Sequence, residues 1–213
     1  MRPRVVAIDG PAGSGKSTLA RALARELRLP YVNTGMMYRA LTVAALERRV
    51  DLDDGDALVR LIGSLRFTFS EGPAPELEVE GWSPEALTAP SIEGQVSRAA
   101  RHPEVREVMR ALQRSFGEHT GAVMEGRDIG TVVFPDAPVK IYLSADSTAR
   151  EARRVEEREG SHADVARQLH ARDARDAVVN PFVPAADAVV VDTTSLTPEQ
   201  TLARALAIVG ERR

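Results

Sequence analysis

Residues 10–17 read Gly-Pro-Ala-Gly-Ser-Gly-Lys-Ser and match the phosphate-binding pattern G-x-x-x-x-G-K-[ST] without a gap. Glycines at these places let the backbone curl, so that several N–H groups can point at one phosphate. The ammonium of Lys16 can follow the β- and γ-phosphates, and the hydroxyl of Ser17 can hold Mg²⁺. The pattern predicts a nucleotide-binding loop made of Gly10, Pro11, Ala12, Gly13, Ser14, Gly15, Lys16, Ser17 and Thr18.

The residues on both sides of this loop fit a position between a strand and a helix. Val5-Val6-Ala7-Ile8 is a short apolar run, typical of a buried strand. After Ser17, apolar residues recur at the spacing of one helical face. Lysine is also rare in this chain. Among its 28 Lys and Arg residues, only Lys16 and Lys140 are lysine. A compact ammonium where the pattern needs one therefore argues against a chance match.

Short apolar segments alternate with segments of helical periodicity along most of the chain. We expect strands at 4–9, 30–33, 122–125, 139–143 and 188–191. We expect helices at 15–28, 35–49, 103–118, 147–159, 163–176 and 198–211. This alternation predicts an α/β fold of the P-loop NTPase type, with a parallel five-stranded sheet flanked by helices. Ligands of such sheets bind at the carboxyl ends of the strands.

One region departs from this alternation. Residues 65–69 and 76–80 each alternate apolar with polar side chains, and the glycine and prolines of 71–75 are typical of a turn. We expect an antiparallel hairpin here, within an insertion at about residues 34–97. The chain is then one domain, whose core is formed by 1–33 and 98–213.

The composition restricts the class of protein. Hydrophobic residues make up 43% and charged residues 28% of the chain, as in ordinary globular proteins. A net charge of −3 gives no general attraction to nucleic acid or membrane, and the absence of cysteine excludes disulfides and thiolate metal sites. No apolar run is long enough to span a membrane, and the start carries no apolar signal segment. We expect a cytoplasmic monomer without nucleic-acid or membrane partners.

Two further segments could face the loop. The first, 33–39, puts Thr34 at the start of a helix and Arg39 one turn further on, where both could hold a second phosphate. The alternative is an N-cap formed by Thr34 with an exposed Arg39. The second, 125–130, follows an apolar run; Arg127 can bind a phosphate through paired hydrogen bonds, and Asp128 can accept from an amine such as N4 of cytosine. The alternative is a structural ion pair between Arg127 and Asp128.

With these segments the chain resembles the bacterial cytidylate kinases, a family of nucleoside monophosphate kinases. The resemblance covers nearly the whole chain, and the hairpin insertion is part of it. Its specific parts are 8–18, Thr34-Gly35-x-x-Tyr38-Arg39, 126–137 and Arg172-Asp173-x-x-Asp176. It implies transfer of the γ-phosphoryl group of ATP to CMP or dCMP, giving CDP or dCDP, with Mg²⁺ as the cofactor. The guanine-specific motif Asn-Lys-x-Asp is absent, which argues against a GTPase.

The resemblance also implies roles for particular residues. Cytosine would be read by Ser97, Arg106 and Asp128. The acceptor phosphate would be bound by Arg39 and Arg127, in a site that includes Thr34 and Tyr38. The sugar would contact Arg172 and Asp176. Charge on the transferred group would be stabilised by Lys16 and by Arg150, Arg153 and Arg154, the last three on a mobile helical lid at about 150–172.

The chain departs from the family pattern after Asp176. The segment 177–180 is shorter than the corresponding segment of the family, and it lacks an arginine that binds the acceptor phosphate there. Arg175 is the nearest spare arginine, and we hypothesise that it swings in on closure. The alternative is a solvated helix residue. Asp192 superficially resembles a Walker B carboxylate, but a strand-end carboxylate is the favoured interpretation, with Mg²⁺ held by phosphates, water and Ser17.

Two rival functions stay open from the sequence alone. One is a kinase for another nucleoside monophosphate, UMP or AMP. The other is a nucleotide-binding sensor that has lost turnover, which the missing arginine keeps open.

Overall fold

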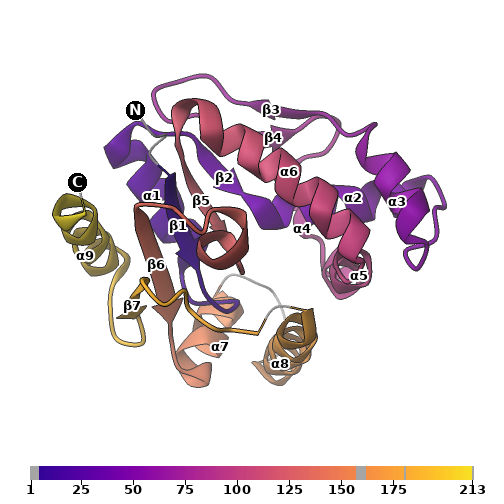
Figure 1. The fold of residues 1–213 in the computed structure, drawn as a ribbon. Coiled ribbons are helices and arrows are strands. Elements are labelled where there is room, and N and C mark those ends of the chain that lie inside the picture. The colour runs from indigo at the N-terminus through magenta and orange to yellow at the C-terminus, as the bar shows by residue number, and fades with distance from the viewer. Residues whose placement is uncertain (1–4, 157–161, 180, 213) are drawn as a thin grey trace.

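A computed structural model of the chain describes residues 5–156, 162–179 and 181–212, without the side chains of 162–164, 168, 172 and 179 (Figure 1). Its centre is a parallel sheet of five strands in the order β2-β5-β1-β6-β7. The strands are β1 Val5–Asp9, β2 Tyr31–Asn33, β5 Ala122–Gly126, β6 Val139–Ser144 and β7 Val189–Asp192. The expected fold is confirmed, and the strand bounds agree closely with those expected; Arg4 lies outside the described residues.

The strand order determines where a ligand site can form. β1 lies in the middle of the sheet, between β5 and β6, and β2 pairs with the other side of β5. In this register Asp9 at the end of β1 stands beside Gly126 at the end of β5. The segments that follow β1, β2 and β5 therefore start at one edge of the sheet. The loop at 10–18 and the predicted substrate-binding segments 33–39 and 125–130 begin at that edge.

Each face of the sheet is covered by helices because side chains alternate along the strands. Val6 and Ile8 pack against α1 Lys16–Leu27 and α9 Pro198–Glu211. Val5 and Ala7 face the opposite layer, which contains η1 Ile129–Val133, a single π-helical turn. α6 Pro103–Thr120 lies on the same side through Phe116. Figure 1 shows α1 and α9 together on one side of the sheet and α6 on the other.

The segment between β2 and α6 shares an apolar core with α6. It contains α2 Thr34–Glu47, α3 Gly55–Ile62, β3 Phe67–Phe69, β4 Leu77–Val79, α4 Pro84–Thr88 and α5 Pro90–Ala100. β3 and β4 form the expected antiparallel hairpin. Leu41, Leu58 and Leu87 pack there against Met109 of α6. The helices α3, α4 and α5 were not among the elements expected from the sequence.

Two helices lie at the end of the sheet to which β1 and β6 point, α7 Ser147–Glu156 and α8 His162–Val179 (Figure 1). The part of the expected helix 147–159 beyond residue 156 lies outside the described residues. α8 contacts α7 on one side and α5 of the insertion on the other. The insertion and α8 therefore meet over the edge of the sheet where the loop begins.

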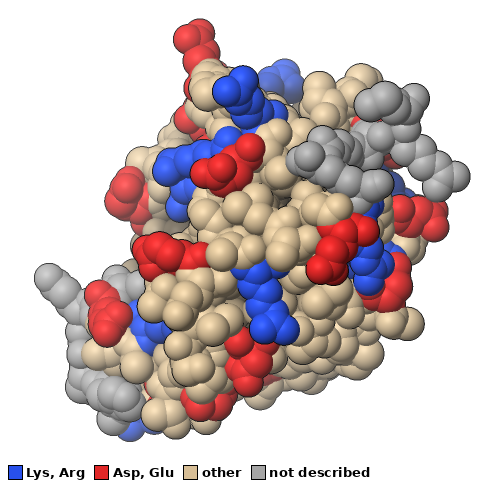
Figure 2. All heavy atoms as spheres, turned by 90° about the vertical axis from the view of Figure 1, so that its left-hand side faces the viewer, with Lys and Arg blue, Asp and Glu red and all other residues tan. Residues whose placement is uncertain are grey.

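Among the described residues, no helix combines the length and apolar character needed to cross a membrane. On the face of the molecule seen in Figure 2, basic and acidic side chains are interspersed, with no large field of one sign.

Candidate active site

The loop between β1 and α1 has the backbone that its glycines permit. Gly10, Gly13 and Gly15 have φ values of 149°, 75° and 88°, a region that other residues rarely adopt. A Cβ atom at Gly10 would lie 2.3 Å from the carbonyl oxygen of Leu143 on β6, so a side chain there would clash with backbone. α1 begins at Lys16, so the free N–H groups of its first turn border the loop.

Every carbonyl oxygen from Gly10 to Ser14 accepts a hydrogen bond from a side chain. The donors are Arg127 Nη1 to Gly10 (2.6 Å), Lys16 Nζ to Pro11 (2.7 Å), Arg150 Nη1 to Ala12 (3.1 Å), Arg153 Nη1 to Gly13 (3.4 Å) and Thr193 Oγ1 to Ser14 (3.1 Å). In a planar peptide the N–H group points away from the carbonyl. Holding the carbonyls from outside therefore leaves the loop N–H groups to face an anion, as phosphate binding requires.

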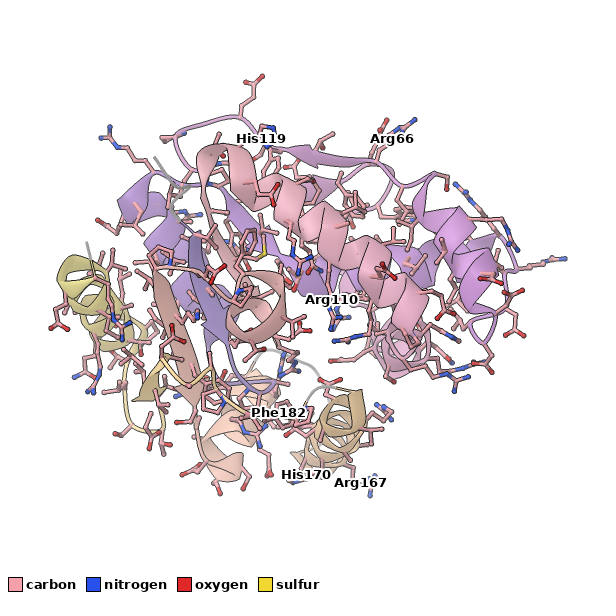
Figure 3. All side chains as sticks on the ribbon, viewed as in Figure 1. Arg66, Arg110, His119, Arg167, His170 and Phe182 are labelled. Atoms are coloured by element: carbon pink, nitrogen blue, oxygen red, sulfur yellow. The ribbon has the colours of Figure 1, made fainter. Side chains whose placement is uncertain are left out.

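Arg127 joins the loop to α8. Its Nη1 binds Gly10 and its Nη2 donates to Oδ2 of Asp176 at 2.6 Å. The guanidinium also lies 5.5 Å from the ring centroid of Phe182, which Figure 3 labels beside α8. The structure thus brings together two of the predicted ligands of the monophosphate, Arg127 and Asp176.

Asp128, the predicted base-reading residue, finds its partners on α6. Its Oδ2 accepts from Arg106 Nη2 at 2.8 Å and from Arg110 Nη2 at 3.0 Å. Arg127 and Asp128 thus have ion-pair partners on different helices, and the alternative of one structural pair does not account for these contacts. Arg110 was not predicted from the sequence.

Tyr38 belongs to the same group of side chains. Burial raises the pKa of Tyr38 to about 12; the cations of Arg106 and Arg110 lower it, and the charge of Asp128 raises it. Ser97 lies half-buried on α5, and its side chain makes no hydrogen bond to another described residue. The structure therefore assembles Tyr38, Arg106 and Asp128, but it does not join Ser97 to them.

The start of α2 corrects one interpretation. The N-cap is Asn33, whose side chain accepts from the N–H of Met36 at 3.3 Å, and not Thr34. The hydroxyl of Thr34 instead donates to the carbonyl oxygen of Glu125 at 2.7 Å. Arg39 is also not an exposed residue: it is 7% exposed.

Arg39 is held within the insertion. Its Nη1 donates to the carbonyl of Leu87 on α4 at 3.2 Å, and its Nη2 to Glu93 on α5 at 3.4 Å. Because Glu93 is itself only 14% exposed, this ion pair is largely shielded from water.

The predicted lid arginines have unequal positions. Arg150 bridges Ala12 and Asp173 on α8, with 2.5 Å between its Nη1 and the carboxylate. Arg153 contacts Gly13 and Thr193, and Arg154 is half-buried on the same helix α7. Arg172 lies on α8, and its side chain is outside the described residues. The side chain of Arg175 is exposed on α8, which agrees with the solvated alternative for the free protein.

Glu125 is a site residue to which the sequence analysis gave no role. It is 3% exposed, its Oε2 accepts from the hydroxyl of Ser17 at 3.0 Å, and its Oε1 accepts from the hydroxyl of Tyr31. Asp192, by contrast, is exposed and accepts from the N–H and hydroxyl of Thr194 at 2.9 and 2.6 Å. These contacts agree with the interpretation of Asp192 as a strand-end carboxylate. The sequence feature that could have identified Glu125 is a carboxylate at the end of an apolar strand beside the loop.

The loop region fits Mg²⁺ that arrives with a nucleotide. The described residues contain no group of three or more His, Asp or Glu side chains that could hold a metal alone. Ser17 and Glu125 nevertheless place a hydroxyl and a carboxylate together, and both are oxygen donors of the kind Mg²⁺ prefers. Mg²⁺ commonly takes one or two protein oxygens and completes its shell with phosphates and water.

Asp9 supports the segment that carries Asp128. Its carboxylate accepts from the N–H groups of Ile129 and Gly130 at 2.9 and 2.8 Å, which fixes the start of η1. Burial raises the pKa of Asp9 to about 6, although both backbone hydrogen bonds lower it.

The chain is similar to known proteins over nearly its whole length. The family model for cytidylate kinase matches residues 6–211. A cytidylate kinase of Desulfitobacterium hafniense (strain Y51) is 41% identical over 215 residues, covering 97% of this chain and 93% of that protein. One of Pectobacterium carotovorum subsp. carotovorum (strain PC1) is 42% identical over 216 residues, covering 97% and 96%. The crystal structure of TT1252 from Thermus thermophilus is similar in fold, with a TM-score of 0.51 at 22% identity over 99% of this chain and 98% of that one. The chain belongs to the cytidylate kinase family.

Proposed function

We propose that this protein transfers the γ-phosphoryl group of ATP to CMP and dCMP, producing CDP and dCDP. The observation that carries the proposal is that two consecutive residues contact different parts of the site. Arg127 contacts the phosphate-binding loop at Gly10, while Asp128 is held by Arg106 on α6. A monophosphate whose base binds at Asp128 would therefore have its phosphate directed toward Arg127 and the loop.

The chemistry of Asp128 favours cytosine over uracil. The pairing edge of cytosine offers an amine donor at N4 and acceptors at N3 and O2. A carboxylate can accept from that amine, and Arg106 can donate to the acceptors. Uracil would present the carbonyl O4 to the carboxylate and a donor at N3, which leaves buried polar groups unpaired.

Phosphoryl transfer requires alignment and neutralisation of charge more than covalent chemistry. No general base is needed, because the acceptor is already a phosphate oxygen. Lys16, the loop N–H groups, Arg150 and Arg153 would stabilise the charge that spreads over the transferred group. Mg²⁺ would neutralise the β- and γ-phosphates, with Ser17 and Glu125 as the residues that hold it. An acceptor phosphate would replace Glu93 and Asp176 as the partner of Arg39 and Arg127.

The proposal includes a monomer that works in the cytoplasm on small substrates alone. The net charge of −3 supports the restriction to small substrates, since it gives no general attraction to nucleic acid or to anionic lipid. Gel filtration and cell fractionation test these two points.

The deciding experiment measures steady-state phosphorylation of CMP, dCMP, UMP and AMP by ATP with Mg²⁺. CMP and dCMP should exceed UMP by about tenfold or more in kcat/KM, the cost of one mispaired buried polar group. A higher kcat/KM for UMP or AMP would contradict the proposed substrate. ATP binding without CMP-dependent release of ADP would favour the sensor.

A further inference from the structure

We propose that Arg110 is a positioning residue for cytosine specificity, which it sets by fixing the carboxylate of Asp128. The inference rests on the proposed function and adds to it a residue that neither the motifs nor the resemblance assigned.

The contact geometry points to this role. Arg106 and Arg110 stand one helical turn apart on α6, and both donate through Nη2 to the same atom, Oδ2 of Asp128, at 2.8 and 3.0 Å. The other oxygen, Oδ1, accepts no hydrogen bond from the described residues. Figure 3 shows Arg110 beneath α6, toward the middle of the molecule.

Two donors on one oxygen restrict the carboxylate more than a single donor would. With one donor, the carboxylate can turn about its broad terminal torsion while keeping the hydrogen bond. With two donors from one rigid helix, the plane of the carboxylate is fixed and Oδ1 keeps its direction. A fixed Oδ1 is the acceptor that the N4 amine of cytosine needs.

The charges around Asp128 favour the same base. Two guanidinium groups face one carboxylate, so a positive charge remains beside the reading group. This remaining positive charge favours the hydrogen-bond acceptors N3 and O2 of cytosine, and it disfavours the N3–H donor of uracil. Because Arg110 also donates to Asp128, the carboxylate does not depend on Arg106 alone, and Arg106 is better able to donate to the base.

Stability alone does not account for Arg110. Its Nε is buried and has no hydrogen-bond partner among the described residues, although its side chain is 27% exposed. A buried donor without an acceptor costs free energy in the unliganded protein. Arg114, one turn further along α6, differs: its Nε and Nη2 donate to the carbonyls of Val133 and Val132, both at 2.9 Å. Arg114 is therefore a matched control that carries the same charge on the same helix.

The test compares kcat and KM for CMP, UMP and ATP among the wild type, Arg110→Met, Arg110→Lys and Arg114→Met. Arg110→Met should raise KM for CMP about tenfold and narrow the CMP/UMP ratio of kcat/KM about fivefold, as expected for a weakened charge-assisted contact. Its kcat and its KM for ATP should stay within about twofold of the wild type, because Arg110 does not touch the loop. Arg110→Lys, which can still donate to Oδ2, should recover most of the ratio, and Arg114→Met should retain it.

A double-mutant cycle separates positioning from a general packing effect. In an Asp128→Ala background, Arg110→Met should change the CMP/UMP ratio less than about twofold, since no carboxylate is left to hold. An equal change in both backgrounds would overturn the proposal, as would an unchanged ratio in Arg110→Met alone. If circular dichroism shows that Arg110→Met does not fold, Arg110→Gln takes its place in the cycle. Failure of the wild type to phosphorylate CMP would reject the proposed function instead.

Discussion

The hydroxyl of Ser17 donates a hydrogen bond of 3.0 Å to Glu125, 108 residues further along the chain. This bond joins the first turn of α1 to the end of β5. The carboxylate is buried and also accepts from the hydroxyl of Tyr31, so its orientation is set from two sides. A buried carboxylate beside a phosphate-binding loop costs free energy unless a cation binds between the carboxylate and the phosphates. Mg²⁺ bound with ATP would be that cation.

Glu125→Gln should therefore weaken the use of Mg²⁺ while preserving the shape of the side chain. Activity at low Mg²⁺ should fall about 10–100-fold, the usual effect of changing a residue that orients a metal ligand. Initial rates measured against Mg²⁺ concentration at saturating ATP and CMP test this. Asp192→Asn is the matched control and should behave as the wild type, because Asp192 is exposed and, among the described residues, its side chain accepts hydrogen bonds from Thr194 alone. An unchanged Mg²⁺ dependence in Glu125→Gln would remove Glu125 from the site.

Lys16→Met should abolish transfer without unfolding the protein. The stabilisation of developing charge by this ammonium should be worth several kcal/mol, so a loss of roughly 10³-fold or more in kcat is expected. Lys140→Met, which changes the other lysine, should show the opposite pattern. Lys140 is 6% exposed and binds Asp187 at 2.8 Å, so its loss should lower the melting temperature and leave kcat nearly unchanged. Near-normal kcat in Lys16→Met would disprove the interpretation of the loop.

Arg175 tests how the site works without the arginine that the family has after Asp176. If this exposed side chain swings in on closure, Arg175→Ala should raise KM for CMP by roughly tenfold, the loss of one charge-assisted contact. KM for ATP should hardly change. An unaltered KM for CMP would mean that Arg39 and Arg127 bind the acceptor phosphate with one cation fewer.

Asp9 should make the stability of the protein depend on pH. Its pKa is raised by burial from 3.8 to about 6, so the folded state holds the proton more tightly than the unfolded state. The resulting stabilisation is fully present below about pH 4 and is lost as the pH rises through about 6. In Asp9→Asn this contribution is absent. The difference in free energy of unfolding, wild type minus Asp9→Asn, should therefore decrease by on the order of 3 kcal/mol between pH 4 and 7. Urea unfolding at a series of pH values measures it, and a constant difference would contradict the raised pKa.

The main elements of the fold could be predicted because their patterns are local. The apolar strands, the loop at 10–17 and the alternation at 65–80 appear in the sequence, and the structure confirms the sheet and the hairpin. The helices α3, α4 and α5 are short and packed in the insertion, where brief apolar runs do not reveal helical periodicity. The caps of α3 and α4, Asp54 and Ser83, were present in the sequence but become informative only with the helix that each begins.

The missed parts of the site depend on contacts between distant segments. Asn33 and Thr34 are both residues that can cap a helix, and the hydrogen bond from Thr34 to Glu125 leaves the cap to Asn33. Arg110 is one of several arginines on a charged helix, and only the position of Asp128 distinguishes it. Spacing along a sequence does not report such partners.

Thr193 lies directly after the last strand, and its hydroxyl binds the loop at Ser14, 179 residues earlier in the chain. During synthesis the N-terminal strand and glycine loop emerge long before this residue exists. The loop therefore lacks one of its five holding contacts until residue 193 has been synthesised. A product that stops before Thr193 should therefore bind nucleotide more weakly than the full sequence, even though it contains the entire motif.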